Sequence, residues 1–220
     1  IREQWLQCEG TWFVGVDALP SCQFGAIAGT PLKGRVMDWL SPVETKPMHP
    51  AQLSVIYEGY PKPRKGEGDA AFNYRLKRDA AHVDGLLPVG QARRRMLKEP
   101  HAYILGVPLN SCSPEASPLV IWEGSHIIMS QTFEKALNDT QPQKWNTVDL
   151  TDVYQAARRQ VFETCPRVAV HADPGEAYVV HRLALHGVAP WAKSASAPRE
   201  GRMIAYLRPK LADVSQWTDI

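Results

Sequence analysis

Chain-breaking residues recur so often along this sequence that they limit the regular elements it can form. Eighteen prolines and 15 glycines among 220 residues leave apolar runs of about five to eight residues. Runs of this length suit β-strands, whereas helices usually need about ten residues or more. The sequence therefore predicts a mainly β fold. We place its strands at residues 11–16, 52–58, 101–109, 119–122, 167–171, 177–181 and 202–208.

Two stretches have the period of helices instead. Residues 130–138 begin with a Ser that suits a helix cap, and residues 151–163 begin with Thr-Asp and bring four apolar side chains to one face. We expect them to form one helical block that interrupts the strands. Residues 61–68, rich in Pro, Lys and Gly, are expected to form a loop inside the domain.

Length and composition indicate a single globular domain over residues 1–220. A chain of this size supports one sizeable core, and a content of 44% hydrophobic and 22% charged residues excludes wholesale disorder. The formal net charge of +2 gives no global reason to expect a nucleic-acid partner. No apolar run approaches the ~20 residues that cross a bilayer, and no export signal is recognisable. We therefore expect a cytoplasmic protein.

The four cysteines, Cys8, Cys22, Cys112 and Cys165, are spread along the chain without a C-x-x-C pair. This spacing excludes a zinc ribbon and a thioredoxin-like redox motif. We expect reduced cysteines that serve in packing, although their even number leaves a disulfide open.

Basic residues concentrate in residues 62–98, which hold ten Lys or Arg against four Asp or Glu. In a nearly neutral protein this gives a local positive field. Two interpretations stay open. The segment is either a solvated loop whose charges are balanced by acids folded nearby, or the border of a site for an anionic substrate.

Two histidine–carboxylate triplets are candidates for a metal site. H-V-D at 82–84 and H-A-D at 171–173 each place an imidazole and a carboxylate on one side of an extended chain. Chance alone supplies roughly 0.7 such triplets at this composition, so the spacing is weak evidence by itself. A facial triad also needs a second histidine. His186, in an apolar run, suits that role. Only the interval from the first triplet to His186 is long enough to hold several strands and the helical block.

Five motifs along residues 80–208 occur in an order that resembles a known enzyme family. They are H-x-D at 82–84, W-E-G-S-H at 122–126, P-G-E at 174–176, L-H-G at 185–187, and Arg202 at the start of the last predicted strand. Together they resemble the Fe(II)/2-oxoglutarate dioxygenases of the phytanoyl-CoA dioxygenase type.

This resemblance implies a double-stranded β-helix, a jelly roll or cupin-like barrel, with a few flanking helices. It implies His82, Asp84 and His186 as Fe(II) ligands, and Arg202 as the residue that binds the distal carboxylate of the co-substrate 2-oxoglutarate. Two imidazoles and one carboxylate leave three metal positions open, and an arginine fork suits a carboxylate. Tyr103, on the strand after the triplet, is a further candidate for contact with 2-oxoglutarate.

Arg202 has two rivals for this role. Arg208 lies six residues further along the same predicted strand and could share its face, while Arg199 lies in the preceding loop. The interval from His186 to Arg202 is longer than in the family, with an inserted loop at 193–200. Some co-substrate contacts are therefore expected to differ.

Two histidines near the motifs are left out of the expected ligand set. His181 lies at an odd spacing from His186 and should face the other side of a regular strand. His126 is expected to cap a turn or to touch the rim of the site.

We therefore expect an Fe(II)- and 2-oxoglutarate-dependent dioxygenase that uses O₂ to hydroxylate a small organic substrate, which the basic segment favours as anionic. Alternatives stay open: a cupin-type or other metal-binding protein that uses no 2-oxoglutarate, a protein hydroxylase of the JmjC type, a non-catalytic barrel, or a zinc hydrolase with the same ligands. The expected partners are small molecules, with no nucleic acid and no membrane. A homo-oligomer is left open.

Overall fold

The computed structural model describes residues 3–220 and is mainly β, which confirms the predicted class. Its strands are β1 (Leu6–Gln7), β2 (Trp12–Leu19), β3 (Ala51–Ile56), β4 (Leu86–Val89), β5 (Arg94–Leu97), β6 (Tyr103–Pro108), β7 (Leu119–Trp122), β8 (Arg167–Val170), β9 (Tyr178–His181), β10 (His186–Val188) and β11 (Arg202–Leu207). Its helices are α1 (Arg35–Leu40), α2 (Asp69–Lys77), α3 (Ser125–Leu137) and α4 (Thr151–Thr164), with the short 3-10 helices η1 (Glu3–Trp5), η2 (Cys8–Gly10), η3 (Pro142–Thr147) and η4 (Val214–Thr218). None of these helices is long and apolar enough to cross a membrane.

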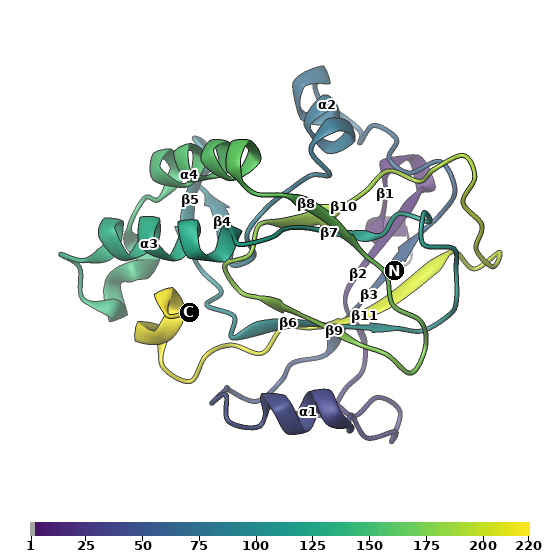
Figure 1. Ribbon diagram of the computed structural model, residues 1–220, viewed down its shortest axis with the longest axis horizontal. Helices are drawn as coiled ribbons and strands as arrows, with labels where there is room; N and C mark the ends of the chain where they lie inside the picture. The colour runs from purple at the N-terminus through teal and green to yellow at the C-terminus, as the bar shows by residue number, and fades with distance from the viewer. Residues whose placement is uncertain (1–2) are drawn as a thin grey trace.

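Two antiparallel sheets face each other across the interior (Figure 1). The larger has the order β1-β2-β3-β11-β6-β9 and the smaller the order β10-β7-β8, while β4 and β5 form a separate hairpin. Ile104 and Ile204 of the larger sheet pack in one buried cluster with Leu119 of the smaller. Since side chains alternate between the faces of a strand, Arg202, Ile204 and Tyr206 all point into this interior.

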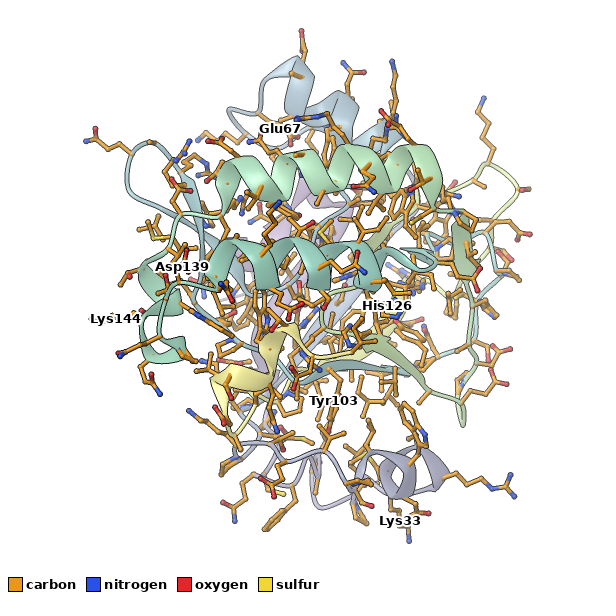
Figure 2. The ribbon with its side chains drawn as sticks, turned by 60° about the vertical axis from the view of Figure 1, so that its left-hand side comes forward. Lys33, Glu67, Tyr103, His126, Asp139 and Lys144 are labelled. Carbon is orange, nitrogen blue, oxygen red and sulfur yellow. The ribbon has the colours of Figure 1, made fainter. Side chains whose placement is uncertain are left out.

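The predicted helical block lies at one end of the sheets. Figure 2 shows α3 and α4 side by side, with η4 next to α3. The rings of Phe133 and Trp217 stack with their centroids 5.0 Å apart and are fully buried there. Helix α3 begins at Ser125, five residues before the predicted start, after Gly124 in a left-handed conformation (φ +79°). Ser130 therefore lies inside α3 and does not cap it, and its hydroxyl donates to the carbonyl of Thr218.

Helices α1 and α2 and the β4–β5 hairpin were not predicted. The basic segment 62–98 therefore contains a helix and a hairpin rather than one solvated loop. Helix α2 is short and polar, and tertiary contacts hold it: Tyr74 lies edge-on to Phe162 of α4, and the buried Arg75 pairs with Glu67. Short helices stabilised by such contacts give little periodicity in the sequence.

All four cysteines are free, in line with the expectation that they are reduced. Cys8 is buried among apolar side chains, whereas Cys22 is exposed. The role in packing therefore holds for Cys8 and not for Cys22.

Candidate metal centre

One bridge between two distant segments brings the predicted histidines together. The backbone N–H of His82 donates to the carbonyl of His186 at 2.8 Å, and the N–H of His186 donates back at 3.0 Å. Gly187 permits this close approach, because a Cβ there would lie 2.2 Å from the carbonyl oxygen of Asp79. The triplet at 82–84 thus lies outside the named strands and is joined to β10 by this bridge.

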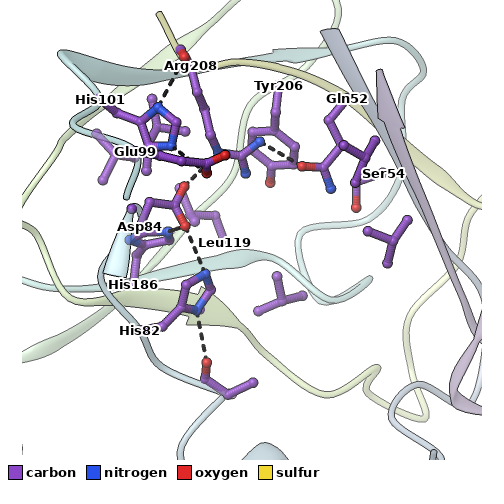
Figure 3. Close-up of a pocket in the computed structure, with 18 of the residues that line it drawn as sticks. Gln52, Ser54, His82, Asp84, Glu99, His101, Leu119, His186, Tyr206 and Arg208 are labelled. Atoms are coloured by element: carbon purple, nitrogen blue, oxygen red, sulfur yellow. Dashed lines mark hydrogen bonds and ion pairs between the residues drawn. The ribbon is translucent and has the colours of Figure 1, made fainter. Parts of the chain in front are cut away.

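His82, Asp84 and His186 form a compact group of potential ligands (Figure 3). Their ligand atoms all lie within 4.8 Å of one another. Oδ1 of Asp84 is 3.1 Å from Nε2 of His82 and 3.7 Å from Nε2 of His186. Ligands at ~2.1 Å from one ion are spaced by about 3 Å when they are adjacent, so these atoms need only small shifts to share a metal.

The second triplet, at 171–173, has no third potential ligand beside it in the described part of the chain. Nε2 of His171 and Oδ2 of Asp173 lie 3.6 Å apart. Within residues 3–220, His82, Asp84 and His186 are the one group of three His, Cys, Asp or Glu side chains that could hold a metal ion.

The backbone orients both imidazoles for metal binding. Nδ1 of His82 lies 3.0 Å from the carbonyl oxygen of Ala80, and Nδ1 of His186 lies 2.9 Å from that of Ala184. A carbonyl accepts a hydrogen bond only from a protonated nitrogen, so each Nδ1 carries the proton of the neutral ring and each Nε2 keeps its lone pair. These two Nε2 atoms are the ring nitrogens that lie beside Oδ1 of Asp84.

The protonation states also suit a divalent cation. Burial is the main cause that lowers the pKa of His186 to about 4. Burial alone would raise the pKa of Asp84, but the charge of Arg208 and the two histidines hold it well below its usual value. At neutral pH the site therefore holds a neutral His186 and an ionised Asp84, which are the forms that bind a metal.

Arg208, just beyond β11, secures the ligand carboxylate. Its Nε donates to Oδ2 of Asp84 at 2.6 Å, and its Nη1 donates to Oε1 of Gln52 at 2.7 Å (Figure 3). The contact leaves Oδ1 facing the histidines. We did not predict this role, since Arg208 was considered only as a rival for binding the co-substrate.

Arg202 lies at the opposite end of the inward-facing row of β11, with roughly 20 Å of strand between it and Arg208 at about 3.3 Å per residue. It is 5% exposed, and its Nη1 has no hydrogen-bond partner. Among residues 3–220, no carboxylate forms an ion pair with it. Arg202 acts on Tyr178: burial and Tyr206 raise the pKa of the Tyr178 hydroxyl, and the charge of Arg202 opposes that rise. The charge of Arg202 is therefore buried and uncompensated.

A cavity of about 610 Å³ opens onto the three ligands. Ile104, Leu119 and Val180 give it an apolar wall between the sheets, and Tyr206 and Arg208 also line it. Arg202 is not among the lining residues. Tyr206, which does line the cavity, is hydrogen-bonded through its hydroxyl to that of Tyr178 at 2.9 Å.

Tyr103 is not placed in this cavity either. It precedes the inward-pointing Ile104 on β6, so its side chain points to the other face of the sheet. There it is 6% exposed in the same buried cluster as Leu105. The structure thus separates Tyr103 from the metal ligands, contrary to the expectation that it contacts the co-substrate.

Several other histidines have roles that the sequence did not indicate. His101 is buried and lines the cavity, with Nδ1 3.2 Å from the carbonyl of Arg208 and Nε2 3.5 Å from the carboxylate of Glu99. His126 and His181 form a separate pair, with ring centroids 5.0 Å apart, outside the cavity lining. His126 lies in the first turn of α3 and not in a turn between strands.

No protein-family model matches the sequence, and no curated protein matches it. Two solved structures are similar to it: the non-heme alpha ketoglutarate dependent epimerase SnoN and the carbocyclase SnoK, both from nogalamycin biosynthesis. For SnoN the identity is 17% and the TM-score 0.34, over 61% of this chain and 39% of that one. For SnoK the identity is 18% and the TM-score 0.38, over 74% of this chain and 49% of that one. The chain thus spans less than half the length of either structure.

Proposed function

We propose that this protein is an Fe(II)- and 2-oxoglutarate-dependent dioxygenase that oxidises an organic substrate in the cavity between its sheets. The observation that carries this proposal is the convergence of His82, Asp84 and His186, whose ligand atoms lie within 4.8 Å of one another while each Nδ1 faces a backbone carbonyl. Two histidines and one carboxylate with open positions form the ligand set typical of non-haem Fe(II) oxygenases. The two facing antiparallel sheets, with the ligands at one end of the interior, support a jelly-roll barrel.

The chain's own residues would hold and orient the reactants. When bound, Fe(II) supplies the activation of O₂ and the oxidation of 2-oxoglutarate. His82, Asp84 and His186 would hold the metal, and Arg208 keeps the carboxylate of Asp84 in one orientation through Oδ2. The apolar wall of the cavity excludes water from the reacting C–H bond, which limits side reactions.

The distal carboxylate of 2-oxoglutarate needs a cation. Contrary to the expectation from the sequence, Arg202 lies outside the cavity at the far end of β11, and a five-carbon acid chelated by the metal is too short to reach it. We therefore propose Arg208 for this role, because it lines the cavity beside the metal ligands. Its guanidinium donates to Asp84 and Gln52 through Nε and Nη1, and its other N–H groups remain for a carboxylate.

The test is an anaerobic titration of the purified protein with Fe(II) and then 2-oxoglutarate, followed by visible absorption. Chelation of the keto acid by iron is expected to give a metal-to-ligand charge-transfer band in the wild type and none in His186→Ala. Protein that binds Fe(II) without forming the band would refute the use of 2-oxoglutarate and favour a cupin-type enzyme. Protein that binds no divalent metal would refute the enzyme altogether.

A further inference from the structure

A second cavity lies on the other side of the segment that carries the ligands. Its volume is about 290 Å³, and it is lined by residues of this segment together with α2, α4 and β5. Five residues border both cavities: Ala80, His82, Asp84, Gly85 and Leu87. The side chain of His82 is 51% exposed at this shared wall. A molecule bound in the second cavity therefore lies next to the metal centre.

Two arginines give the second cavity its charge. Arg95 of β5 and Arg158 of α4 both line it and are partly buried. In the described part of the chain, neither forms an ion pair with a carboxylate, whereas the nearby Arg94 pairs with Asp149 and Asp152. Among the described lining residues, the one carboxylate is that of Asp84, which is paired with Arg208, so the charges of Arg95 and Arg158 have no carboxylate of their own.

The surrounding side chains fix these cations in place. The guanidinium of Arg158 lies 4.7 Å from the ring centroid of Tyr74 and 5.3 Å from that of Tyr154. Nη1 of Arg95 donates to the carbonyl of Leu86 at 3.2 Å. A guanidinium carries five N–H donors, so both arginines keep donors free for a ligand. Cations held in this way suit carboxylates and phosphates.

Tyr154 links the arginines to the ligand segment. Its hydroxyl accepts a hydrogen bond at 3.1 Å from the backbone N–H of Val83, the residue between the two ligands His82 and Asp84. Within residues 3–220 the hydroxyl donates no hydrogen bond, so its proton is also free for an acceptor. Arg95, Arg158 and Tyr154 therefore present three donors to one space.

We infer that the second cavity binds an oxyanion, a carboxylate or a phosphate, carried by the organic substrate. The identification of this ligand as the substrate rests on the proposed function, whereas the oxyanion site itself rests on the cavity and its arginines. An anionic end held between Arg95 and Arg158 places the remainder of the molecule across the exposed edge of His82. The substrate would then extend into the first cavity, beside the metal centre. This inference assigns part of the basic segment to substrate binding.

The oxyanion site is tested by isothermal titration of the metal-free protein with inorganic phosphate at low ionic strength. Arg95→Met and Arg158→Met remove the charge but keep an apolar stem, and Arg93→Met and Arg159→Met remove neighbouring exposed charges as matched controls. We expect saturable binding that weakens at least tenfold in each cavity variant and stays within twofold of the wild type in each control. No saturable binding, equal weakening in all four variants, or binding lost only in Arg202→Met would overturn the site.

Circular dichroism and thermal melting identify any variant that fails to fold, and Arg158→Lys then replaces Arg158→Met. Lysine retains a charge but lacks the fork, so it should restore binding only in part. Full restoration would show that charge alone suffices and would overturn the built site.

The link to the metal centre is tested with Mn(II)-loaded protein and the ³¹P relaxation of phosphate. Strong paramagnetic relaxation is expected in the wild type and its loss in Arg158→Met, whereas phosphate that binds without enhanced relaxation would contradict the shared wall. If the protein binds no Mn(II), the proposed function fails while the calorimetric result still decides the oxyanion site.

The substrate class is tested by succinate release from 2-oxoglutarate in the presence of organic acids and phosphate monoesters, each paired with its neutral amide or alcohol. We expect the anionic members to stimulate release and the neutral ones to have little effect. Equal stimulation by both members of the pairs would overturn an anionic substrate.

Discussion

Nε of Arg208 donates to Oδ2 of Asp84 at 2.6 Å, across an interval of 124 residues. Arg208, which follows the last strand, thereby fixes the carboxylate of Asp84. Since Oδ2 is occupied by the guanidinium, Oδ1 is the oxygen left facing the two imidazoles. The geometry of the ligand set thus depends on a residue that is not itself a ligand.

Replacing Arg208 should weaken metal binding. Arg208→Met removes the hydrogen bond that orients Asp84, and loss of such a partner typically costs about 10–100-fold in metal affinity. Titration with Mn(II) or Co(II) measures the effect, and Arg199→Met, an exposed charge change in the loop before β11, serves as control. Equal affinity in wild type and Arg208→Met would show that the ion pair does not position the ligand.

Replacing Arg202 should leave both 2-oxoglutarate and the metal in place. Since Arg202 lies outside the cavity, we expect Arg202→Met to match the wild type within twofold in Mn(II) affinity and in the concentration of 2-oxoglutarate needed for half-maximal charge-transfer absorption. Its free energy of unfolding in urea should rise by about 1 kcal/mol or more, because it buries no unpaired charge. A tenfold rise in the 2-oxoglutarate concentration needed by Arg202→Met would return the distal-carboxylate role to Arg202.

Removing a ligand histidine should abolish metal binding, whereas changing the other triplet should not. His82→Ala and His186→Ala each delete one of three ligands, and we expect at least a 100-fold loss of Mn(II) affinity. His171→Ala is the matched control, because His171 has the same H-x-D spacing but no third ligand among the described residues. A comparable loss in His171→Ala would contradict the assignment of the site.

The stability of the metal-free protein should fall as the pH is lowered from 7 towards 4. Burial, with the charges of Arg182 and His126, lowers the pKa of His181 to about 4, and His186 has a similarly lowered pKa. Each histidine then binds a proton more readily in the unfolded chain than in the folded one, so unfolding is favoured between the unfolded pKa near 6.5 and the folded pKa near 4.

Urea unfolding at pH 7, 6 and 5 measures this loss of stability. His181→Gln removes one of the two groups and should flatten the dependence on pH. Saturating Mn(II) should also flatten it, since a bound metal keeps His186 unprotonated. A free energy of unfolding that stays constant between pH 7 and 5 would contradict the lowered pKa values.

The sequence determined the strand pattern to within a few residues for most of the sheet. Residues 119–122 were predicted with the bounds that β7 has, and the predicted strand at 202–208 differs from β11 by one residue. Pro118 and Gly124 flank the first of these strands, and Gly201 and Pro209 flank the second, so the limits of both are set locally. The grouping of His82, Asp84 and His186 could also be proposed from their spacing and from the order of the motifs around them.

Only the tertiary structure decided which charges are paired. Arg202 begins β11 and Arg208 follows its last residue, and nothing in their spacing shows that Asp84 neutralises Arg208 while Arg202 stays without a carboxylate. Likewise, Arg95 and Arg158 meet in one cavity although β5 and α4 lie far apart in the sequence. Such pairings depend on long-range packing, because the free energy of a charge is set by the groups that surround it in space and not by its neighbours along the chain.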